Sequence, residues 1–215
     1  MLIRFKVMFV FFLAMVPTGC SKKSQEDVMR IPVIEGKATL PCVAVFIDKT
    51  RVSGPSDPGV VLAVWDDGTA ITSKKTDKGG PPYYQSKIPT EALQGFFHRL
   101  NVESVLIQST CKRFSGFDSP FMCIYVRDGH VELLYDSWHE IFEADGECVA
   151  TQGTVEALEG RDRNQVIAAW SQDYRMFRKE WQILREQTTW LVLQGKDEHV
   201  IATTDFKYKY ATVKW

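Results

Sequence analysis

The sequence lacks the local signatures of the common enzyme classes. A zinc-binding HExxH motif, a phosphate-binding P-loop, a dinucleotide-binding glycine fingerprint and a G-x-S-x-G nucleophile motif are all missing. No histidine stands at a metal-ligand spacing from a second histidine or a cysteine. These gaps predict no metal and no cofactor. They do not exclude an enzyme, because catalytic triads assemble in space from scattered residues.

The chain also has no marked excess of either charge. It carries 26 lysines and arginines against 27 aspartates and glutamates. The first 19 residues contain Arg4 and Lys6 and no acid, so the remainder has 24 basic and 27 acidic side chains and a formal charge of −3. A nucleic-acid partner is therefore not expected, because nucleic acids select basic surfaces.

No apolar stretch is long enough for a membrane-spanning helix. The longest is the run Val7–Val16, which as a helix would cover roughly 15 Å, about half of a bilayer's hydrocarbon core. Arg4 and Lys6 precede this run, and the small pair Thr18-Gly19 follows it just before Cys20. A basic start, a short apolar centre and a small-residue end predict a secretory leader.

The end of this leader resembles the lipobox of bacterial lipoproteins. Thr18, Gly19 and Cys20 occupy the key positions, and Pro17 stands where an aliphatic residue is usual. The resemblance implies that the sulfur of Cys20 receives a diacylglyceryl group and that the leader is then cut before it. Two acyl chains anchor a protein stably, so the membrane contact would be lipid. The alternative is an ordinary exported protein whose Cys20 is discarded or joins a disulfide.

The leader also sets the expected organisation and location of the chain. We expect a leader at 1–19, the lipidated cysteine with a polar tether at 20–37, and a single domain at 38–215. In enterobacterial lipoproteins an aspartate after the cysteine signals retention at the inner membrane. Ser21 stands there instead, so the outer membrane is favoured, with the domain facing the periplasm or the exterior. An envelope protein is a candidate partner.

Lipidation of Cys20 would leave four cysteines, an even number that suits an oxidising compartment. Cys111 and Cys123 flank a turn segment with glycine and are the first expected disulfide, which leaves Cys42 to pair with Cys148. Three connectivities stay open, because sequence does not separate them. A zinc site is the weaker alternative, since no C-x-x-C spacing occurs.

Turn signals and apolar patterns predict an α+β fold with a largely antiparallel sheet, covered by one short and one long amphipathic helix. Two Asp-Gly turns predict hairpins that join 60–65 to 69–72 and 121–126 to 131–135. Further strands are expected at 40–47, 105–109, 188–193, 200–203 and 205–215, the last as an edge strand.

Apolar residues at spacings of three and four predict the short helix at 89–101 and the long helix at 163–187. The stripe of the long helix is rich in aromatic residues and consists of Val166, Trp170, Tyr174, Phe177, Trp181 and Leu184. A core seam explains this stripe better than a ligand platform does, because a surface helix buries such a face.

The segment 76–84 (TDKGGPPYY) is the most distinctive loop. Its two glycines and two prolines would present Tyr83 and Tyr84 on a stiff, extended segment. The two tyrosines are therefore candidates for a binding surface. The alternative, which we favour, is a turn that packs them on the sheet.

The strongest chemical cluster is the run Asp136-Ser137-Trp138-His139-Glu140. One hypothesis makes His139 a general base that Asp136 or Glu140 orients, with a hydroxyl nucleophile from elsewhere. Ser137 is expected to cap a short helix, with Glu140 at the capping-box position, and not to be the nucleophile. The competing interpretation, which we favour, is that Trp138 and Phe142 dock this helix while His139 makes a fixed hydrogen bond.

The order of the W-D-D-G hairpin, the G-G-P-P-Y loop and the S-W-H-E segment, over residues 60–143, resembles uncharacterised bacterial lipoproteins. That resemblance implies no activity. The leading expectation is a lipid-anchored envelope protein that acts as a binding or structural module. The alternative is an envelope hydrolase, which requires His139 to line a pocket within hydrogen-bond reach of a Ser, Thr or Cys side chain.

Overall fold

The computed structural model describes residues 28–34, 39–49, 59–114, 119–151, 153–201 and 208–214. The predicted leader and Cys20 lie outside the described residues, so cleavage and lipidation stay predictions. Among the helices of the described residues, none is both long and apolar enough to span a membrane.

Eight strands form one sheet in the order β11-β5-β4-β3-β2-β7-β8-β6. Every neighbouring pair is antiparallel except β6 and β8, which run parallel. In chain order these strands are β2 (Val43–Asp48), β3 (Gly59–Val64), β4 (Thr69–Ser73), β5 (Tyr83–Lys87), β6 (Thr110–Phe114), β7 (Phe121–Asp128), β8 (Val131–Ser137) and β11 (Lys196–Ile201). The predicted α+β fold with a largely antiparallel sheet is confirmed.

Both predicted hairpins form, and each turns at its Asp-Gly pair. Gly68 and Gly129 adopt positive φ angles of 78° and 59°, the left-handed geometry that a tight hairpin turn needs. Asp67 fixes the first turn, because its Oδ1 accepts a hydrogen bond from the Thr69 amide at 2.8 Å. An added Cβ at Gly68 would collide with the Ile88 carbonyl, so only glycine allows this close approach.

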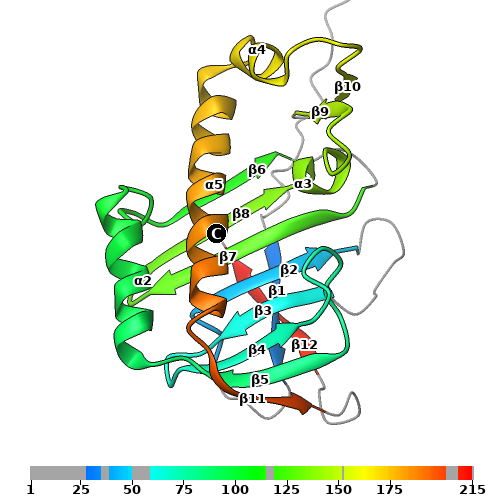
Figure 1. The fold of residues 1–215 in the computed structure, drawn as a ribbon. Coiled ribbons are helices and arrows are strands. Elements are labelled where there is room, and N and C mark those ends of the chain that lie inside the picture. Colours follow the sequence, from blue (N-terminus) through cyan, green and yellow to red (C-terminus); the bar gives the residue numbers. More distant parts are fainter. Residues whose placement is uncertain are drawn as a thin grey trace, which may run out of the picture.

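The helices in the described residues are α2 (Thr90–Val102), α3 (His139–Phe142), α4 (Arg163–Ala168) and α5 (Gln172–Val192). The long helix α5 crosses one face of the sheet with α2 beside it (Figure 1). Its buried stripe consists of Tyr174, Phe177, Trp181, Leu184, Thr188 and Leu191. This stripe packs on aliphatic side chains of the central strands, such as Val45 and Ile124, so it is the predicted core seam.

The long helix predicted at 163–187 differs from the structure at both ends. Ser171 interrupts it, because its Oγ accepts a hydrogen bond from the Tyr174 amide at 3.2 Å and caps the start of α5. At the other end α5 continues to Val192, so the strand predicted at 188–193 does not form. Thr188 and Leu191 extend the buried stripe, and this packing overrides the strand preference of the TTWLVL segment.

The strand predicted at 105–109 is also wrong. The Val105 and Leu106 amides both donate to the Leu100 carbonyl, at 3.0 and 3.3 Å, so this segment closes the end of α2 and buries both side chains. The strand comes directly afterwards as β6, which lies at the sheet edge beside β8. The helix predicted at 89–101 is confirmed as α2.

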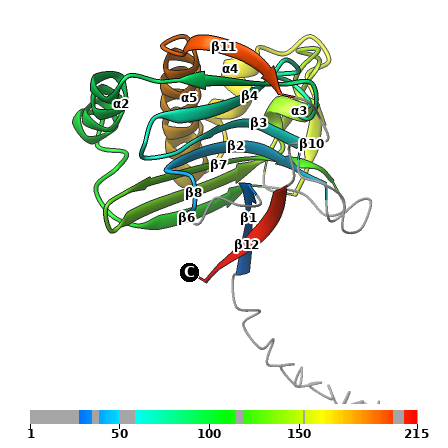
Figure 2. The same cartoon turned by 90° about the horizontal axis from the view of Figure 1, so that it is seen from below.

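The opposite face of the sheet is partly covered by a separate antiparallel ribbon of β1 (Val28–Ile34) and β12 (Tyr208–Lys214) (Figure 2). Ile31 packs there with Phe46, Tyr125 and Leu134. Residues 28–34 therefore belong to the fold and not to the polar tether predicted for 20–37. The strand predicted at 205–215 pairs with β1, so over its described residues it lies outside the main sheet. A small hairpin of β9 (Cys148–Ala150) and β10 (Val155–Ala157) follows α3.

Candidate functional site

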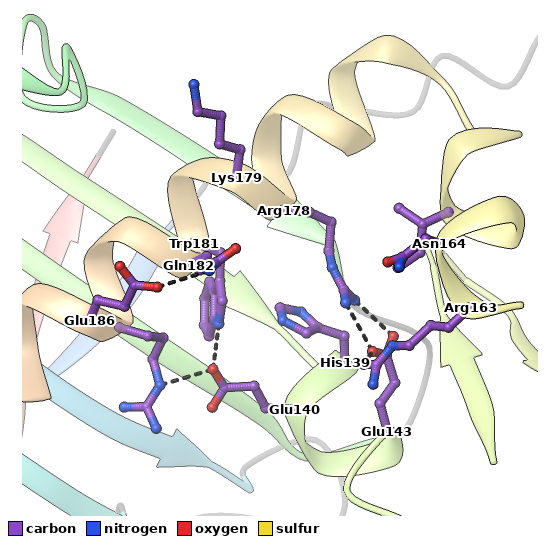
Figure 3. A pocket seen from close by; sticks show the side chains of 12 residues that line it. His139, Glu140, Glu143, Arg163, Asn164, Arg178, Lys179, Trp181, Gln182 and Glu186 are labelled. Atoms are coloured by element: carbon purple, nitrogen blue, oxygen red, sulfur yellow. Dashed lines mark hydrogen bonds and ion pairs between the residues drawn. The ribbon is translucent and has the colours of Figure 1, made fainter. Parts of the chain in front are cut away.

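A pocket of about 790 Å³ opens between α3, the start of α4 and one flank of α5 (Figure 3). Its wall is dominated by titratable side chains, chiefly His139, Glu140, Glu143, Arg163, Arg178 and Arg185. The histidine and the first glutamate come from α3, and Glu143 directly follows that helix. The arginines come from α4 and α5. The pocket thus joins residues that lie more than 40 positions apart in the sequence.

His139 reaches this pocket because β8 ends at Ser137 and α3 begins two residues later. The side chain of Ser137 lies on the same sheet face as those of Leu133 and Tyr135, which is the face that α5 covers. Ser137 Oγ shares a hydrogen bond with His139 Nδ1. The capping role predicted for Ser137 is wrong, since Trp138 occupies the N-cap position of α3 without a side-chain cap bond.

Trp138 and Phe142 dock α3, as the favoured interpretation of this segment predicted. Their rings meet edge to face at 5.1 Å between centroids, and Trp138 Nε1 donates to the Thr151 carbonyl at 2.6 Å. This docking holds the helix on the side of the β1–β12 ribbon, while His139 turns toward α5. Ser137 and Trp181 thus hold the His139 ring in one orientation.

The His139 ring is almost completely buried, with 6% of its surface exposed. It stands edge to face against Trp181, at 5.2 Å between ring centroids. Burial, together with the nearby positive charges of Arg178, Arg163 and Arg185, lowers the pKa of His139 to about 2. The imidazole is therefore neutral at any physiological pH, and it acts as a fixed hydrogen-bonding group.

Glu143 is the most tightly held carboxylate of the pocket, with 2% of its side chain exposed. Arg178 binds it with both terminal nitrogens, Nη1 to Oε1 at 2.8 Å and Nη2 to Oε2 at 3.0 Å. Arg163 binds Oε2 from the opposite side, and the Ala150 amide donates to Oε1 at 2.8 Å. Two guanidinium groups and one amide thus hold a single carboxylate, which offsets the cost of burying its charge.

Glu140 forms the other end of the pocket wall. Its Oε1 accepts hydrogen bonds from Trp181 Nε1 at 2.7 Å and from Arg185 Nε at 2.9 Å. About a quarter of each charged side chain is exposed, 26% for Arg185 and 27% for Glu140. This pair fixes Trp181, which in turn supports the His139 ring.

Neither carboxylate proposed to orient His139 occupies the position that this role requires. Asp136 directly precedes Ser137 on β8, so its side chain points to the opposite face of the sheet. There it lies 3.1 Å from Arg113 Nε and is 1% exposed. Glu140 is engaged by Trp181 and Arg185, as described above. The structure instead brings Ser137 to the ring, whereas the sequence predicts a capping role for this serine.

The two candidate binding-surface tyrosines lie on β5 within the sheet. Tyr83 is only 2% exposed and packs with Val60, Ala63 and Trp65, so it is not on a surface. Tyr84 is half-buried and pairs with Thr72 on β4. The alternative that packs these tyrosines on the sheet is confirmed for Tyr83.

The register of the sheet is inconsistent with the expected Cys111–Cys123 disulfide. Cys111 pairs with Leu134 on one side of β8, and Tyr125, two residues from Cys123, pairs with Leu134 on the other side. Two strand spacings separate the outer strands by about 10 Å. That distance exceeds the Cα separation of about 7 Å that a disulfide tolerates.

The expected Cys42–Cys148 disulfide is not formed either, because the two residues lie at opposite ends of β7. The Cys42 carbonyl accepts from the Arg127 amide at 2.7 Å, near the end of that strand. Cys148 Sγ donates to the Phe142 carbonyl of α3 at 2.8 Å, beyond the strand's start. Along β7 this separation amounts to about 17 Å. Burial raises the pKa of the Cys42 thiol to about 12.

The arginines and Glu143 were missed by the sequence interpretation. Arg178 and Arg185 stand seven residues apart on α5, so they project from one flank, beside the apolar stripe. That spacing was a usable signal. Glu143 was less visible, because its partners come from distant helices. Among the described residues no group of three or more His, Cys, Asp or Glu side chains is arranged to hold a metal ion.

These features define the class: an α+β protein whose helix-covered sheet face carries a charged pocket around a buried, neutral histidine. No protein-family model, no curated protein and no solved structure matches the chain.

Proposed function

We propose that the chain is a lipid-anchored envelope protein that binds a ligand in the pocket around His139. The observation that carries the binding role is the state of His139 itself. A neutral imidazole, held by Ser137 and Trp181, lies at the wall of an open pocket among prearranged charged groups. Preorganised polar groups of this kind give a ligand its orientation and specificity.

The same state of His139 argues against proton transfer. A general base is most effective when its pKa lies near the working pH. Burial and three arginines lower the pKa of His139 to about 2, far below that range. Two of the wall's carboxylates are engaged in ion pairs, Glu143 with two arginines and Glu140 with Arg185. The pocket is therefore better suited to recognition than to acid–base chemistry.

The anchor is supported by the leader and by the cysteine at its end. Labelling of expressing cells with an alkyne analogue of palmitate tests it directly, with the full-length chain as the sample. We expect label and membrane association in the wild type and neither in Cys20→Ala. A Ser21→Ala variant serves as the control and should retain both. An unlabelled wild type, or a Cys20→Ala form that stays on the membrane, contradicts the anchor.

The binding role is tested by hydrogen–deuterium exchange on the chain from Ser21 to Trp215, which retains every described element. The probe is the low-molecular-mass fraction of an envelope extract. We expect slower exchange of amides in α3 and in the α5 segment 178–185, and no such protection in Arg185→Gln. Arg175, which is exposed on the same helix, provides the matched control Arg175→Gln. Unchanged exchange around the pocket contradicts the binding role.

An envelope hydrolase is the second candidate, and the contact between His139 and Ser137 favours it. The geometric criterion for the hydrolase, a hydroxyl within reach of a pocket histidine, is met by this pair. Ser137, however, has no exposed surface, so it would act by orienting the ring. Hydrolysis of p-nitrophenyl butyrate by the wild type at a rate that falls in both His139→Asn and Ser137→Ala would favour the hydrolase over the binding module.

A further inference from the structure

We propose that the pocket around His139 is the charged end of a longer groove that binds a single-chain amphiphile bearing one negative charge. This inference rests on the proposed binding function and names its ligand class. The ligand's anionic group would lie near Arg163, Arg178 and His139, and its apolar chain would follow α5 toward Val192.

The groove consists of three neighbouring pockets that share wall residues. The pocket around His139 shares Glu140 and Arg185 with a second pocket of about 370 Å³. The second shares Thr76 and Arg185 with a third pocket of about 230 Å³. We call these three pockets the α5 groove. From Arg178 to Val192 its helical wall covers about 21 Å at the rise of an α-helix.

The wall of the charged end carries a net positive charge. The wall of the first pocket contains four cations, namely Arg163, Arg178, Lys179 and Arg185. It contains three carboxylates, namely Glu140, Glu143 and Glu186, and the neutral His139, so the net charge is +1. The surplus arises at Glu143, which faces two guanidinium groups. A ligand group with one negative charge complements this site.

Of the two arginines that bind Glu143, Arg163 is the one better placed to reach such a group. Its side chain is 39% exposed, whereas that of Arg178 is 16% exposed and is held by both nitrogens on Glu143. Arg163 comes from the first residue of α4, opposite α5, so it closes the pocket from the far side (Figure 3). It can therefore contact a ligand without breaking the buried pair between Arg178 and Glu143.

The opposite end of the groove is less polar than the charged end. Half of the residues that line the third pocket are aliphatic, namely Val45, Val61, Leu62 and Val192, and Thr76, Arg185 and Thr189 lie beside them. Thr188 also lines it, but its hydroxyl already donates to the Arg185 carbonyl at 3.0 Å. The amides of a bound peptide would lose hydrogen bonds to water along the aliphatic part of this wall, and each unpaired group would weaken binding. A hydrocarbon chain has no hydrogen-bonding groups to leave unpaired, so an acyl chain fits this wall better than a peptide does.

The test is titration calorimetry with dodecanoate, below its micelle concentration, on the chain from Ser21 to Trp215. We expect micromolar binding of dodecanoate, at least ten-fold weaker binding of dodecanol, and none of acetate. Dodecanol removes the charge and acetate removes the chain, so each probe isolates one end of the groove. A dodecyltrimethylammonium arm reverses the charge and is expected not to bind.

Two pairs of variants locate the ligand. Arg163→Gln should weaken dodecanoate binding roughly ten-fold by removing one charge-assisted contact, while Arg161→Gln, two residues away and outside the pocket, should leave it unchanged. Val192→Gln should weaken dodecanoate binding about three- to ten-fold by placing an amide against the chain. Leu193→Gln alters a side chain that is 75% exposed and should have no effect.

Three results would overturn this inference. Equal affinity for dodecanol and dodecanoate would show that the charged end does not bind the anionic group. Unchanged dodecanoate binding by Val192→Gln would show that the chain does not lie in the third pocket. Absence of dodecanoate binding would reject the amphiphile. If extract still slowed exchange around His139 in that case, the proposed binding function would stand with another ligand; if it did not, both proposals would fall.

Discussion

The two flanks of α5 meet the sheet in different ways. On one flank α2 packs closely, with Phe96 and Leu100 fully buried and the guanidinium of Arg99 3.5 Å from the centre of the Trp190 ring. On the other flank lies the α5 groove, where arginines and glutamates pair with one another around open space. One helix thus has a closed, mostly apolar flank and an open, charged flank.

This difference between the flanks separates the residues that stabilise the fold from those that are available to bind a ligand. Burial of aliphatic and aromatic side chains on the α2 flank contributes stability in proportion to the area removed from water. The charged flank gains little in this way, because buried ion pairs roughly repay their desolvation. A chain selected only for stability would cover this flank with a second apolar helix. The open flank is therefore where we place function.

The largest expected effect is on the closed flank. Phe96→Ala removes a ring with no exposed surface and leaves a cavity between α2 and the sheet. We expect a loss of about 3–5 kcal/mol in the free energy of unfolding, measured by urea denaturation. Phe97→Ala is the matched control, because the neighbouring ring is half-buried and should cost clearly less. Equal losses in the two variants would mean that α2 does not close this flank.

The next prediction tests whether the ion pairs at Glu143, on the open flank, contribute to the stability of the fold. Arg178→Gln leaves Glu143 buried with Arg163 as its remaining cation. We expect a loss of about 2–3 kcal/mol in the free energy of unfolding at pH 7, because a buried carboxylate loses its bidentate partner. Arg175→Gln, an exposed arginine of the same helix, should change stability by less than about 0.5 kcal/mol.

A double variant keeps this prediction falsifiable. Glu143→Gln combined with Arg178→Gln removes the unpaired charge together with its partner and should recover part of the loss. If Arg178→Gln costs no more than Arg175→Gln, the cluster at Glu143 does not hold α5 to α3. In that case the comparison between the flanks would become sharper, since the most buried ion pairs of the open flank would not contribute to folding.

The third prediction concerns the pH dependence of stability, which His139 on the open flank should dominate. The pKa of His139 is lowered to about 2 in the folded chain, whereas a histidine in an unfolded chain titrates near 6.5. Between these values the unfolded state binds a proton that the folded state does not. The contribution of His139 to the free energy of unfolding is therefore complete above pH 6.5 and declines as the pH falls toward 2.

We expect His139 to account for a loss of about 2 kcal/mol between pH 6.5 and pH 4.5. Urea denaturation at both pH values measures it, as the difference between the wild type and His139→Gln, which cannot titrate. His98→Gln, at an exposed position of α2, should keep the pH dependence of the wild type. Identical pH dependence in all three proteins would show that His139 is accessible to protons in the folded state.

The closed flank was largely predictable from the sequence, and the open flank was not. Apolar residues at spacings of three and four located α2 and the buried stripe of α5, because burial leaves a periodic pattern in the chain itself. Asp-Gly pairs located both hairpins for an equally local reason. Errors arose where tertiary packing decided, as at 188–193, where continuation of the stripe overrode a segment rich in strand formers.

The candidate site shows why the contacts of the open flank could not be predicted from the sequence. The sequence points to His139, but it predicts Asp136 or Glu140 as the group that orients the ring and a helix cap as the role of Ser137. The chain changes from strand to helix between Ser137 and His139, and this change turns both side chains to the same side. Glu143 contacts Arg163 and Arg178 only because three separate segments pack together, and no local sequence pattern predicts such a contact.

The smallest expected effect is the most informative about the open flank. Arg185 lines all three pockets of the α5 groove and pairs with Glu140, yet about a quarter of each side chain is exposed. Partly exposed ion pairs contribute little, so Arg185→Gln should change the free energy of unfolding by less than about 1 kcal/mol in urea denaturation. The same variant should lose the ligand-dependent protection of α3 and α5. If the open flank serves to bind a ligand, Arg185 should matter for binding and hardly for folding. A large loss of stability in Arg185→Gln would instead show that the open flank stabilises the fold, as the closed flank does.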